Sequence, residues 1–389
     1  MPKHIVCHYG ELSLKGKNRD FFEKRLVLNM KNQLQKNAPD DVSQIKRAFG
    51  RIIISLSPQG NKNPEKALQT LKNIFGLTSF SLAIQLPQDM EKIKQVVLET
   101  LQKQKFETFR ITTKRSQKNF PLTSEEVAKE VGAYIVEKLG KKVALKNFDA
   151  NCFIEIAEKY ALVYTEKIKG LGGMPVGTAG KALVMLSGGL DSPVAAFHCL
   201  KRGLSTSFIH FHSIPYTSKN SVEKVEQLAS QLKNFSSSGK IHLVPFADVQ
   251  KEIMLKTPQK LRILLYRRMM LRIAEKIAQK NKIKALVTGD CLAQVASQTL
   301  ENLSAVGQAS STLLLRPLIC FDKEEIITIA RTIGTYEISI LPHDDCCTRL
   351  MPQKPELHAN LEEILEAEKA LDIPELIQKT LAESEFKII

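Results

Sequence analysis

The stretch 182-ALVMLSGGLDSPVAAFHC-199 decides the fold that the sequence predicts. Its first five residues, 182–186, are apolar, as is typical of a buried parallel strand. The segment SGGLDS at 187–192 follows at once, and Pro193 then suits the first position of a helix, with Ser192 as its N-cap. The sequence therefore predicts a strand, a glycine-rich turn and the start of a helix.

A turn of this kind is suited to hold a phosphate group. The first N–H groups of a helix lack partners within the helix, and the helix dipole favours negative charge there. Gly188 and Gly189 allow the backbone to approach a ligand closely. Ser187 and Ser192 add hydroxyl donors, and Asp191 can hold Mg²⁺ against the phosphates. The competing interpretation is an ordinary glycine-rich turn between a strand and a helix.

The spacing of this turn differs from the GxxxxGK[ST] pattern of the P-loop NTPases. It resembles the SGGxDS motif of the PP-loop ATP pyrophosphatases. That resemblance implies an enzyme that splits ATP between its α and β phosphates. It also implies that the enzyme adenylylates a carbonyl oxygen of a second substrate.

From residue 182 onward the sequence alternates between strand-like and helix-like segments. The strands are expected at 182–186, 205–211, 240–246 and 284–288, and the helices at 193–202, 221–234, 258–280 and 322–333. Such alternation predicts an α/β fold, a doubly wound parallel sheet with helices on both faces. Its ligand is expected at the carboxyl ends of the strands, where the SGGLDS turn lies.

Length and composition indicate a multidomain protein of the cytoplasm. A chain of 389 residues favours two or three domains. No apolar stretch approaches the roughly 20 residues of a membrane span, and MPKHIVCHYGEL at the start lacks the apolar core of a signal peptide. The seven cysteines form no CxxC pair. This pattern suits a reducing compartment rather than a disulfide framework, and no membrane association is expected.

The positive charge of the chain is concentrated in its first part. Residues 1–170 hold 30 Lys and Arg against 18 Asp and Glu, a surplus of 12 out of the formal net charge of +15. A surplus of this kind is the electrostatic signature of nucleic-acid binding. A solvated lysine-rich surface would give the same count, so charge alone leaves both interpretations open.

The first 170 residues have the pattern of an α+β protein. A βαββαβ succession over about 3–83 predicts a ferredoxin-like arrangement. Thr123 and Glu126 form a capping box before a helix that Gly140 ends. Two strands, near 151–157 and 160–168, are expected to complete this half.

This half resembles a THUMP domain preceded by a ferredoxin-like domain. The resemblance rests on GELSLKGKNR at 10–19, KRSQKNFPLTSEE at 114–126 and EKIKGLGGMPVGTAGK at 166–181. It implies binding to RNA, typically tRNA. The candidate phosphate contacts are Lys15, Lys17, Arg19, Lys114, Arg115 and Lys118. Phe120, at the end of the second motif, equally suits a hydrophobic core.

Further residues are expected at the same sheet edge as the SGGLDS turn. His210 and Phe211 end the second predicted strand and could contact an adenine, although a core Phe and a surface His are equally compatible. Gly289 ends the fourth predicted strand and would permit close approach of a ligand. One of the arginines in YRRMMLR at 266–272 could face the nucleotide, whereas the methionines are expected in the core.

Nearly the whole chain resembles one family, the tRNA 4-thiouridine synthetases, ThiI. The specific matches are LSGGLDSPVA at 186–195, FHSIPYTS at 211–218, YRRMMLRIA at 266–274, GDCLAQVASQT at 289–299 and DDCCTRLMPQKP at 344–355. The resemblance implies three domains, expected at 1–75 (ferredoxin-like), 76–170 (THUMP) and 171–389 (PP-loop). The ATP-binding residues implied are Met185, Leu186, Ser187, Gly188, Gly189, Asp191, Ser192, His210, Phe211, Arg267, Gly289 and Gln298. Two departures from the family pattern are Cys291, where Ser is usual, and Ala293, where Gly is usual.

The adjacent pair Cys346-Cys347 is the candidate for sulfur chemistry. A thiolate is nucleophilic and can carry a terminal sulfur atom as a persulfide. The resemblance implies that a cysteine of this loop is catalytic; Cys347 fits the motif best and Cys346 comes next. Asp191 is expected to assist through Mg²⁺. Two buried thiols are the alternative interpretation, and an iron–sulfur cluster is not expected because CxxC pairs are absent.

The activity implied is that of a tRNA uracil 4-sulfurtransferase. ATP would adenylylate O4 of uridine 8 of tRNA, and persulfide sulfur would then displace AMP. The chain is expected to lack a rhodanese domain and the thiazole-synthesis role attached to it. Sulfur would therefore come through Cys346, a partner such as a cysteine desulfurase, or free sulfide. A homodimer is a further expectation from the family. The alternatives are another PP-loop tRNA modifier, such as a 2-thiouridylase, and an RNA-binding protein with an inactive ATP site.

Overall fold

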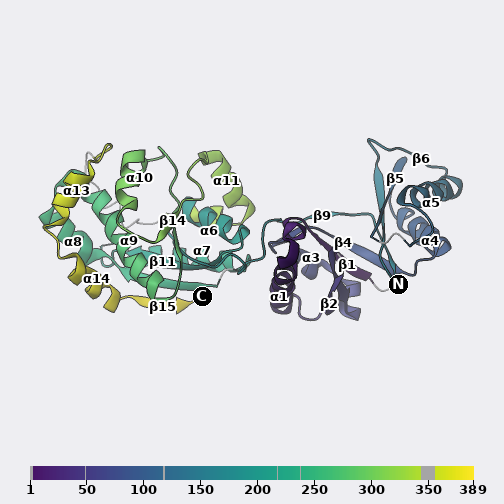
Figure 1. Ribbon diagram of the computed structural model, residues 1–389, viewed down its shortest axis with the longest axis horizontal. Coiled ribbons are helices and arrows are strands. Elements are labelled where there is room, and N and C mark those ends of the chain that lie inside the picture. The colour runs from purple at the N-terminus through teal and green to yellow at the C-terminus, as the bar shows by residue number, and fades with distance from the viewer. Residues whose placement is uncertain (1–2, 49, 117–118, 217, 237, 343–354) are drawn as a thin grey trace. The chain divides into compact units, whose positions relative to one another are not determined.

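The computed structural model describes residues 3–48, 50–116, 119–216, 218–236, 238–342 and 355–389. These form two compact units, Met1–Pro175 and Val176–Ile389. The fold class predicted from the sequence is confirmed. The amino-terminal unit is α+β, and the carboxyl-terminal unit is a largely parallel α/β sheet with helices on both faces (Figure 1).

The amino-terminal unit is built on one nine-stranded sheet, in the order β2-β3-β1-β4-β8-β7-β5-β6, with β9 paired to β4. Its elements are β1 (Lys3–Tyr9), the 3₁₀ turns η1 (Glu11–Leu14) and η2 (Gly16–Asn18), α1 (Arg19–Asn37), β2 (Val42–Ala48), β3 (Arg51–Leu56), α2 (Pro58–Lys62), α3 (Glu65–Lys72), β4 (Leu77–Leu86), α4 (Met90–Leu101), β5 (Thr108–Arg115), α5 (Ser124–Leu139), β6 (Lys142–Val143), β7 (Ala150–Ile156), β8 (Ala161–Tyr164) and β9 (Ile168–Lys169). The long strand β4 pairs with β1 and also with β8, so it joins the two halves of the sheet.

Two hydrophobic cores lie along this sheet. Helices α1 and α3 bury Leu26, Met30 and Leu71 against the strands β1, β3 and β4. Helices α4 and α5 pack together against β5 and β7 and bury a second set of aliphatic and aromatic side chains (Figure 1). Phe120 belongs to this second core, which decides between its two interpretations.

The helix α5 shows how local sequence fixes an element boundary. The Thr123 side chain accepts a hydrogen bond from the Glu126 N–H, and the Glu126 side chain accepts one from the Thr123 N–H. Gly140 ends the helix in the left-handed conformation, with φ of 63°, which glycine adopts at little cost. The predicted capping box and helix end are both confirmed.

The carboxyl-terminal unit has a six-stranded sheet in the order β14-β13-β10-β11-β12-β15. Its elements are β10 (Lys181–Met185), α6 (Asp191–Lys201), β11 (Ser205–His212), α7 (Asn220–Lys233), β12 (Lys240–Pro245), α8 (Ala247–Lys256), η3 (Gln259–Leu261), α9 (Arg262–Lys280), β13 (Ala285–Val287), η4 (Ala296–Gln298), α10 (Leu300–Gly307), β14 (Leu313–Leu315), α11 (Lys323–Thr332), α12 (Tyr336–Ser339), α13 (Leu361–Glu368), α14 (Ile373–Ala382) and β15 (Glu385–Ile388). The strands pair in parallel except β15, which is antiparallel to β12 at the edge.

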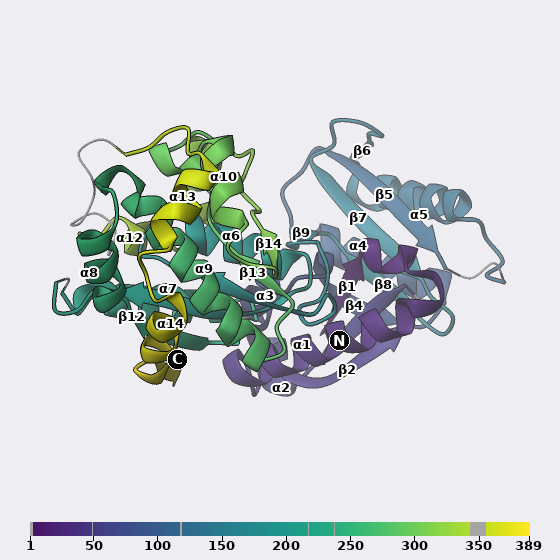
Figure 2. The ribbon, with the colours of Figure 1, turned by 60° about the vertical axis from the view of Figure 1, so that its left-hand side comes forward.

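Helices cover both faces of this sheet. The helices α6 and α7 pack on each other and on β11, and α11 and α12 pack against them. On the opposite face α9 packs against β10 and β13, with α8, α10 and α14 around it, as Figure 2 allows the reader to follow. Met269 and Met270 of α9 are buried in this core, as expected from the sequence.

Candidate nucleotide-binding site

The loop between β10 and α6 is closed by two serine side chains. Ser192 is 4% exposed, and its Oγ accepts a hydrogen bond from the Ser187 N–H over 2.9 Å. The same oxygen lies 3.1 Å from the Oγ of Ser187 and 3.2 Å from the Ser187 carbonyl oxygen. The two glycines are thus held in a compact turn at the carboxyl end of β10, where the sequence placed a phosphate cradle.

One detail of this turn differs from the prediction. The helix α6 begins at Asp191, and Leu190 occupies the N-cap position without a side-chain cap. Ser192 is therefore not the N-cap. Its hydroxyl reaches back across the turn to Ser187 and closes the loop. The helix α6 starts at Asp191, two residues before the predicted first position, Pro193.

Asp191 projects from the start of α6 into a polar cluster. Its Oδ1 accepts a hydrogen bond from the Nζ of Lys323, and its Oδ2 accepts one from the amide of Gln294, both over 2.9 Å. Lys323 was not among the predicted site residues. Lys323 occupies the first position of α11, where the helix dipole disfavours a cation, and this unusual placement was the sequence signal for a nearby anion.

Gly289 lies very close to the backbone of α6, while its predicted contact with a ligand stays a prediction. A Cβ built on this residue would lie 2.8 Å from the backbone nitrogen of Ser192. The loop after β13 therefore packs directly on the first turn of α6. The glycine allows this contact, so it shapes the site through the protein itself.

Asp290 comes next and is the most heavily hydrogen-bonded carboxylate of the site. It is 5% exposed. Its Oδ1 accepts from Arg267 and, over 3.4 Å, from the amide of Gln298, while its Oδ2 accepts from Thr288 over 2.7 Å and from Arg316 over 3.3 Å. Burial raises the pKa of this carboxyl, but the charges of Arg267 and Arg316 and the Thr288 hydrogen bond outweigh that effect and lower it. The group is therefore held as an anion.

Two predicted ATP residues, Arg267 and Gln298, are brought together by this one carboxylate. Arg267 also donates to the carbonyl oxygen of Ser297 over 2.9 Å. The neighbouring Arg268 points elsewhere: it is 2% exposed and pairs with Glu368 over 2.8 Å. Arg267 is thus the arginine of α9 that faces the loop.

The last residues of β11, where a contact with adenine was predicted, are buried. The Nδ1 of His210 lies 3.0 Å from the carbonyl oxygen of Leu186, which links β11 to the cradle. Phe211 is 5% exposed, and its ring packs edge-on against Phe246 with centroids 5.3 Å apart. Phe211 therefore packs in the core, but His210 is only 8% exposed and is not the surface histidine of that interpretation, so the contact of these residues with a nucleotide stays a prediction. Met185 at the end of β10 is only partly buried.

The loop that carries Gln294 also contains a strained residue. Ala293 has a φ of 59°, in the left-handed region that favours glycine. Its N–H donates to the carbonyl oxygen of Gln298 over 2.9 Å. Cys291 nearby is buried, which raises its pKa to about 11 and makes it a poor nucleophile.

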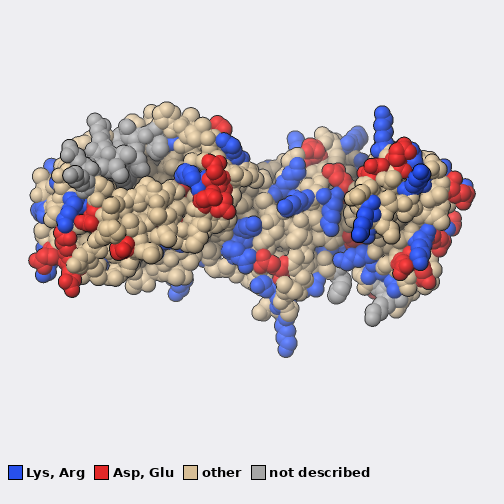
Figure 3. Space-filling view, turned by 90° about the horizontal axis from the view of Figure 1, so that it is seen from above, with Lys and Arg blue, Asp and Glu red and all other residues tan. Residues whose placement is uncertain are grey.

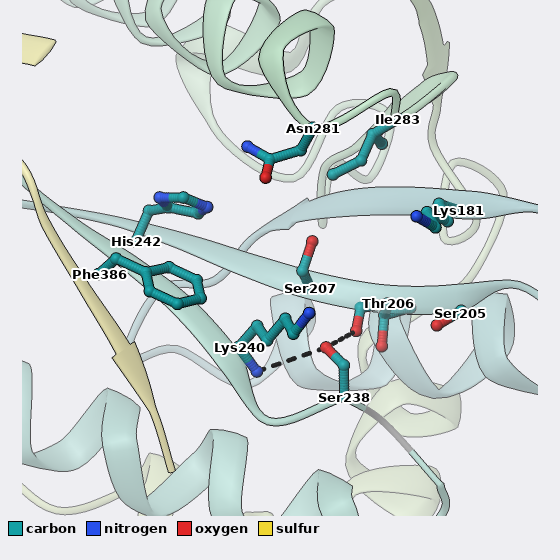
Figure 4. A pocket seen from close by; sticks show the side chains of 10 residues that line it. All are labelled: Lys181, Ser205, Thr206, Ser207, Ser238, Lys240, His242, Asn281, Ile283 and Phe386. Carbon is teal, nitrogen blue, oxygen red and sulfur yellow. Dashed lines mark hydrogen bonds between the residues drawn. The ribbon is translucent and has the colours of Figure 1, made fainter.

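A separate cavity of about 120 Å³ lies at the amino ends of the parallel strands, opposite the carboxyl ends that carry the SGGLDS turn (Figure 4). It is lined by the starts of β10, β11 and β12, including Lys181, Ser207 and Lys240, and by Phe386 of β15. Since the three strands are parallel, their starts are far from the carboxyl ends that carry the cradle. None of the predicted ATP residues lines this cavity.

The predicted RNA contacts of the amino-terminal unit fall into two groups. Lys17 is exposed and lines a surface pocket together with Arg19 and Arg47. Arg115 instead donates to the carbonyl oxygens of Phe120 and Leu122, both over 2.8 Å, so it holds its own loop together. On the face shown in Figure 3, the basic side chains of this unit are interspersed with acidic ones.

The remaining predicted RNA contacts, Lys15, Arg19, Lys114 and Lys118, differ in their surroundings. Arg19 pairs with Glu23 over 2.5 Å, and the Nζ of Lys15 lies 5.4 Å from the centroid of the Phe22 ring. Lys114 is exposed and lines a second pocket of the same unit. Lys118, like Cys346 and Cys347, lies outside the described residues, so these three remain predictions from the sequence.

A buried carboxylate of the amino-terminal unit contacts side chains on several strands of its sheet. Glu155 on β7 is 4% exposed; it contacts His8 of β1 over 2.7 Å and Arg51 of β3 over 2.6 Å. It also accepts a hydrogen bond from the hydroxyl of Tyr164 over 2.6 Å. The cluster therefore ties strands of the ferredoxin-like half to strands of the following half.

Among the described residues, no group of three His, Cys, Asp or Glu side chains is arranged to hold a metal ion. No helix of this part of the chain combines the length and the apolar character that a bilayer span requires.

Family models match consecutive parts of the chain. The ferredoxin-like domain of ThiI matches residues 4–81, and the THUMP domain matches residues 87–166. The model described as thiamine biosynthesis protein (ThiI) matches residues 177–373, which is about half of the chain and includes the cradle and Asp290. The chain belongs to the ThiI family. The resemblance that the sequence motifs indicated is confirmed.

Curated ThiI relatives align over almost the full length. A probable tRNA sulfurtransferase of Caldanaerobacter subterraneus subsp. tengcongensis is 43% identical over 378 residues, 97% of each chain. One of Thermus thermophilus is 42% identical over 381 residues, 98% of this chain and 92% of the relative.

Two solved structures share this architecture. A 4-thiouridine synthetase in a complex with RNA and bound ATP is 34% identical and has a TM-score of 0.89, with both chains covered completely. PH1313 of Pyrococcus horikoshii is 27% identical, with a TM-score of 0.68, and the match covers 85% of this chain and 99% of PH1313.

Proposed function

We propose that this ThiI-family protein is an ATP-dependent tRNA sulfurtransferase that makes 4-thiouridine at position 8 of tRNA. The observation that carries the proposal is the full-length similarity to a 4-thiouridine synthetase that binds RNA and ATP. The SGGLDS turn supports it, since it lies at the carboxyl end of a central parallel strand and opens a helix. The domain boundaries proposed are near residues 75 and 170.

The first step is adenylylation of O4 of the uridine, with release of pyrophosphate. The backbone and hydroxyl groups of the turn 187–192 are proposed to receive the departing phosphates, because donors fixed in advance stabilise developing negative charge. Lys323, which contacts Asp191, adds a positive charge at the same edge. Arg267 and Gln298 are proposed to hold the rest of the nucleotide.

Mg²⁺ is the proposed metal, and Asp191 is its proposed protein ligand. A single carboxylate together with substrate phosphates is a common way to bind this ion, and the side chain of Asp191 is 22% exposed. When bound, Mg²⁺ would neutralise phosphate charge. Both oxygens of Asp191 are engaged by Lys323 and Gln294, so these two side chains would adjust their positions when the ion binds.

The second step is sulfur transfer, and it is proposed for Cys347, with Cys346 as the other candidate. The terminal sulfur of a cysteine persulfide would attack C4 of the activated uridine, and AMP would leave with the O4 oxygen. A second thiol would then cleave the resulting S–S bond, which releases 4-thiouridine and leaves a disulfide for an external thiol to reduce. A cysteine desulfurase is the proposed persulfide donor.

Four further features belong to this proposal. The enzyme class is tRNA uracil 4-sulfurtransferase, and the location is the cytoplasm. The tRNA is proposed to contact Lys15, Lys17, Arg19, Lys114, Arg115 and Lys118. A homodimer is proposed by analogy with the family.

The test is reconstitution with purified components. The full chain is incubated with unmodified tRNA, ATP, Mg²⁺, cysteine and a cysteine desulfurase, and the tRNA nucleosides are analysed by mass spectrometry. Formation of 4-thiouridine at position 8 that depends on ATP is the expected result. A 2-thiouridine product would favour the alternative modification enzyme. Tight tRNA binding without any thiolation would favour an RNA-binding protein with an inactive ATP site.

A further inference from the structure

Asp290 is saturated with hydrogen bonds in a way that fixes its neighbours. A carboxylate can accept about four hydrogen bonds and donates none when ionised. Asp290 receives four, from Arg267, Gln298, Thr288 and Arg316. Two of these donors come from the loop and strand beside it, and two come from α9 and from the segment after β14. One buried side chain therefore restrains the positions of four polar side chains.

The contact with Gln298 settles the orientation of its amide group. Because the carboxylate accepts hydrogen bonds only, Gln298 must present its NH₂ group to Asp290. Its Oε1 then points away from the carboxylate. Gln298 is 9% exposed, and among the described residues its Oε1 has no hydrogen-bond partner.

A buried acceptor without a partner is unfavourable, since it has lost its water and gained nothing in return. A bound molecule that offers a donor would satisfy it. The donors of ATP at neutral pH are the amino group of adenine and the hydroxyl groups of ribose, whereas its phosphates are acceptors. The chemistry of the Gln298 oxygen therefore matches the nucleoside part of ATP.

We propose that Asp290 is a positioning residue for the nucleotide. It fixes the guanidinium group of Arg267 and turns the amide of Gln298, so that the Gln298 oxygen accepts a hydrogen bond from the nucleoside. Asp290 itself does not touch ATP. The inference rests on the proposed function, because it takes ATP as the ligand of this edge of the sheet.

The first experiment separates binding of ATP from the chemical step. Asp290→Asn replaces one acceptor oxygen by an NH₂ group, which faces donors. The KM for ATP in the thiolation assay is expected to rise at least tenfold, while kcat at saturating ATP and the KM for tRNA stay within about threefold of the wild-type values. Asp248→Asn, an exposed acid of the same unit paired with Lys379, is the matched control and is expected to change neither constant. An unchanged KM for ATP in Asp290→Asn would overturn the proposal.

A second experiment uses nucleotide analogues and does not depend on the folding of the Asp290 variant. Wild-type protein and Gln298→Ala are compared with ATP, 2′-deoxy-ATP, 3′-deoxy-ATP and purine riboside triphosphate, which lacks the amino group. Wild type is expected to reject one analogue by at least tenfold in kcat/KM, because its buried oxygen would then be left without a donor. Gln298→Ala is expected to lose that discrimination. The rejected analogue identifies the donor as a ribose hydroxyl or the adenine amino group.

The outcomes distinguish this inference from the proposed function. Wild-type protein that makes no 4-thiouridine with ATP would remove both. Active wild-type protein that uses all four nucleotides equally would overturn only the inference. So would a Gln298→Ala variant that keeps the full discrimination.

Discussion

Glu155 in the amino-terminal unit and Asp290 in the carboxyl-terminal unit are both buried acids that contact arginine, yet their partners differ in kind. Glu155 contacts His8 and Arg51, which lie more than 100 residues earlier in the chain on other strands of the same sheet. Asp290 contacts residues of the loops and helix that border the nucleotide turn. The comparison suggests that the first acid holds a fold together and the second arranges a site.

The substitution with the largest expected effect is Asp191→Asn. It is expected to lower the rate of thiolation without changing the stability of the protein. Thiolation is expected to fall about 100-fold, because the proposed protein ligand of Mg²⁺ loses its negative charge. Stability is expected to stay near that of the wild type, since the ion pair of Asp191 with Lys323 is partly solvated. Initial rates and thermal melting curves measure the two effects. A rate within tenfold of the wild type would contradict the role.

The opposite behaviour is expected of Glu155→Gln. Arg51 is 4% exposed and would be left as a buried charge without its partner. The unfolding free energy is expected to drop by about 3 kcal/mol. Urea unfolding followed by circular dichroism measures it, with the exposed Glu166→Gln as the control. The KM for ATP is expected to be unchanged; a raised KM without loss of stability would break the comparison.

The same acid predicts how the protein responds to low pH. Burial raises the pKa of Glu155, but the contact with His8 and the charges of His8 and Arg51 outweigh it and lower the pKa to about 2. A pKa below the unfolded value means that the stabilisation is complete above about pH 4.3 and is lost as the pH falls toward 2. Melting temperatures between pH 5 and 2 are therefore expected to fall more steeply in the wild type than in Glu155→Gln. Parallel curves would contradict this.

A smaller effect is expected at the surface of the amino-terminal unit. Lys17 is exposed, whereas Arg115 is engaged with carbonyl groups of its own loop. Lys17→Gln is expected to weaken tRNA binding several-fold and to reduce the slope of log affinity against log salt by about 1, as for the loss of one phosphate contact. Filter binding at several salt concentrations tests this. Unchanged affinity and slope would remove Lys17 from the RNA interface.

The smallest expected effect concerns backbone strain beside the nucleotide turn. Ala293 has a positive φ, which costs an L-residue about 1–2 kcal/mol, while glycine would cost about 0.5–1 kcal/mol in lost freedom. Ala293→Gly is therefore expected to raise stability by no more than about 1 kcal/mol and to leave the KM for ATP unchanged. Thermal melting and the thiolation assay measure both. A destabilised variant would show that this φ is not strained in the folded protein.

The sequence predicted the parts of the molecule that depend on neighbouring residues. The strand, turn and helix at 182–199 form as expected apart from the N-cap, and the capping box of Thr123 and Glu126 also forms, because its hydrogen bonds span only a few positions. It missed the edge strand β15, which is only four residues long and pairs with a strand far away in the sequence, β12. It also missed α8 and β14.

The acids that organise each unit were not predictable in the same way. Glu155 lies in the strand predicted near 151–157 and Asp290 in the motif at 289–299, but the sequence does not identify their arginine partners, because these come from distant segments that only the folded sheet brings together. The sequence predicts Ser192 as the N-cap because proline is favoured at the first position of a helix, a preference that considers only adjacent residues. The bond to Ser187 across the turn decides its role instead.

Two consecutive arginines of α9 point to different carboxylates. Arg267 is held by Asp290 beside the nucleotide turn, and Arg268, with Arg272, is held by the buried Glu368 of α13. Neighbouring residues of a helix are separated by about 100° around its axis. Ion pairs therefore hold the helix on two sides. A rotation of α9 about its axis that separated Arg267 from Asp290 would also break the ion pair between Arg268 and Glu368.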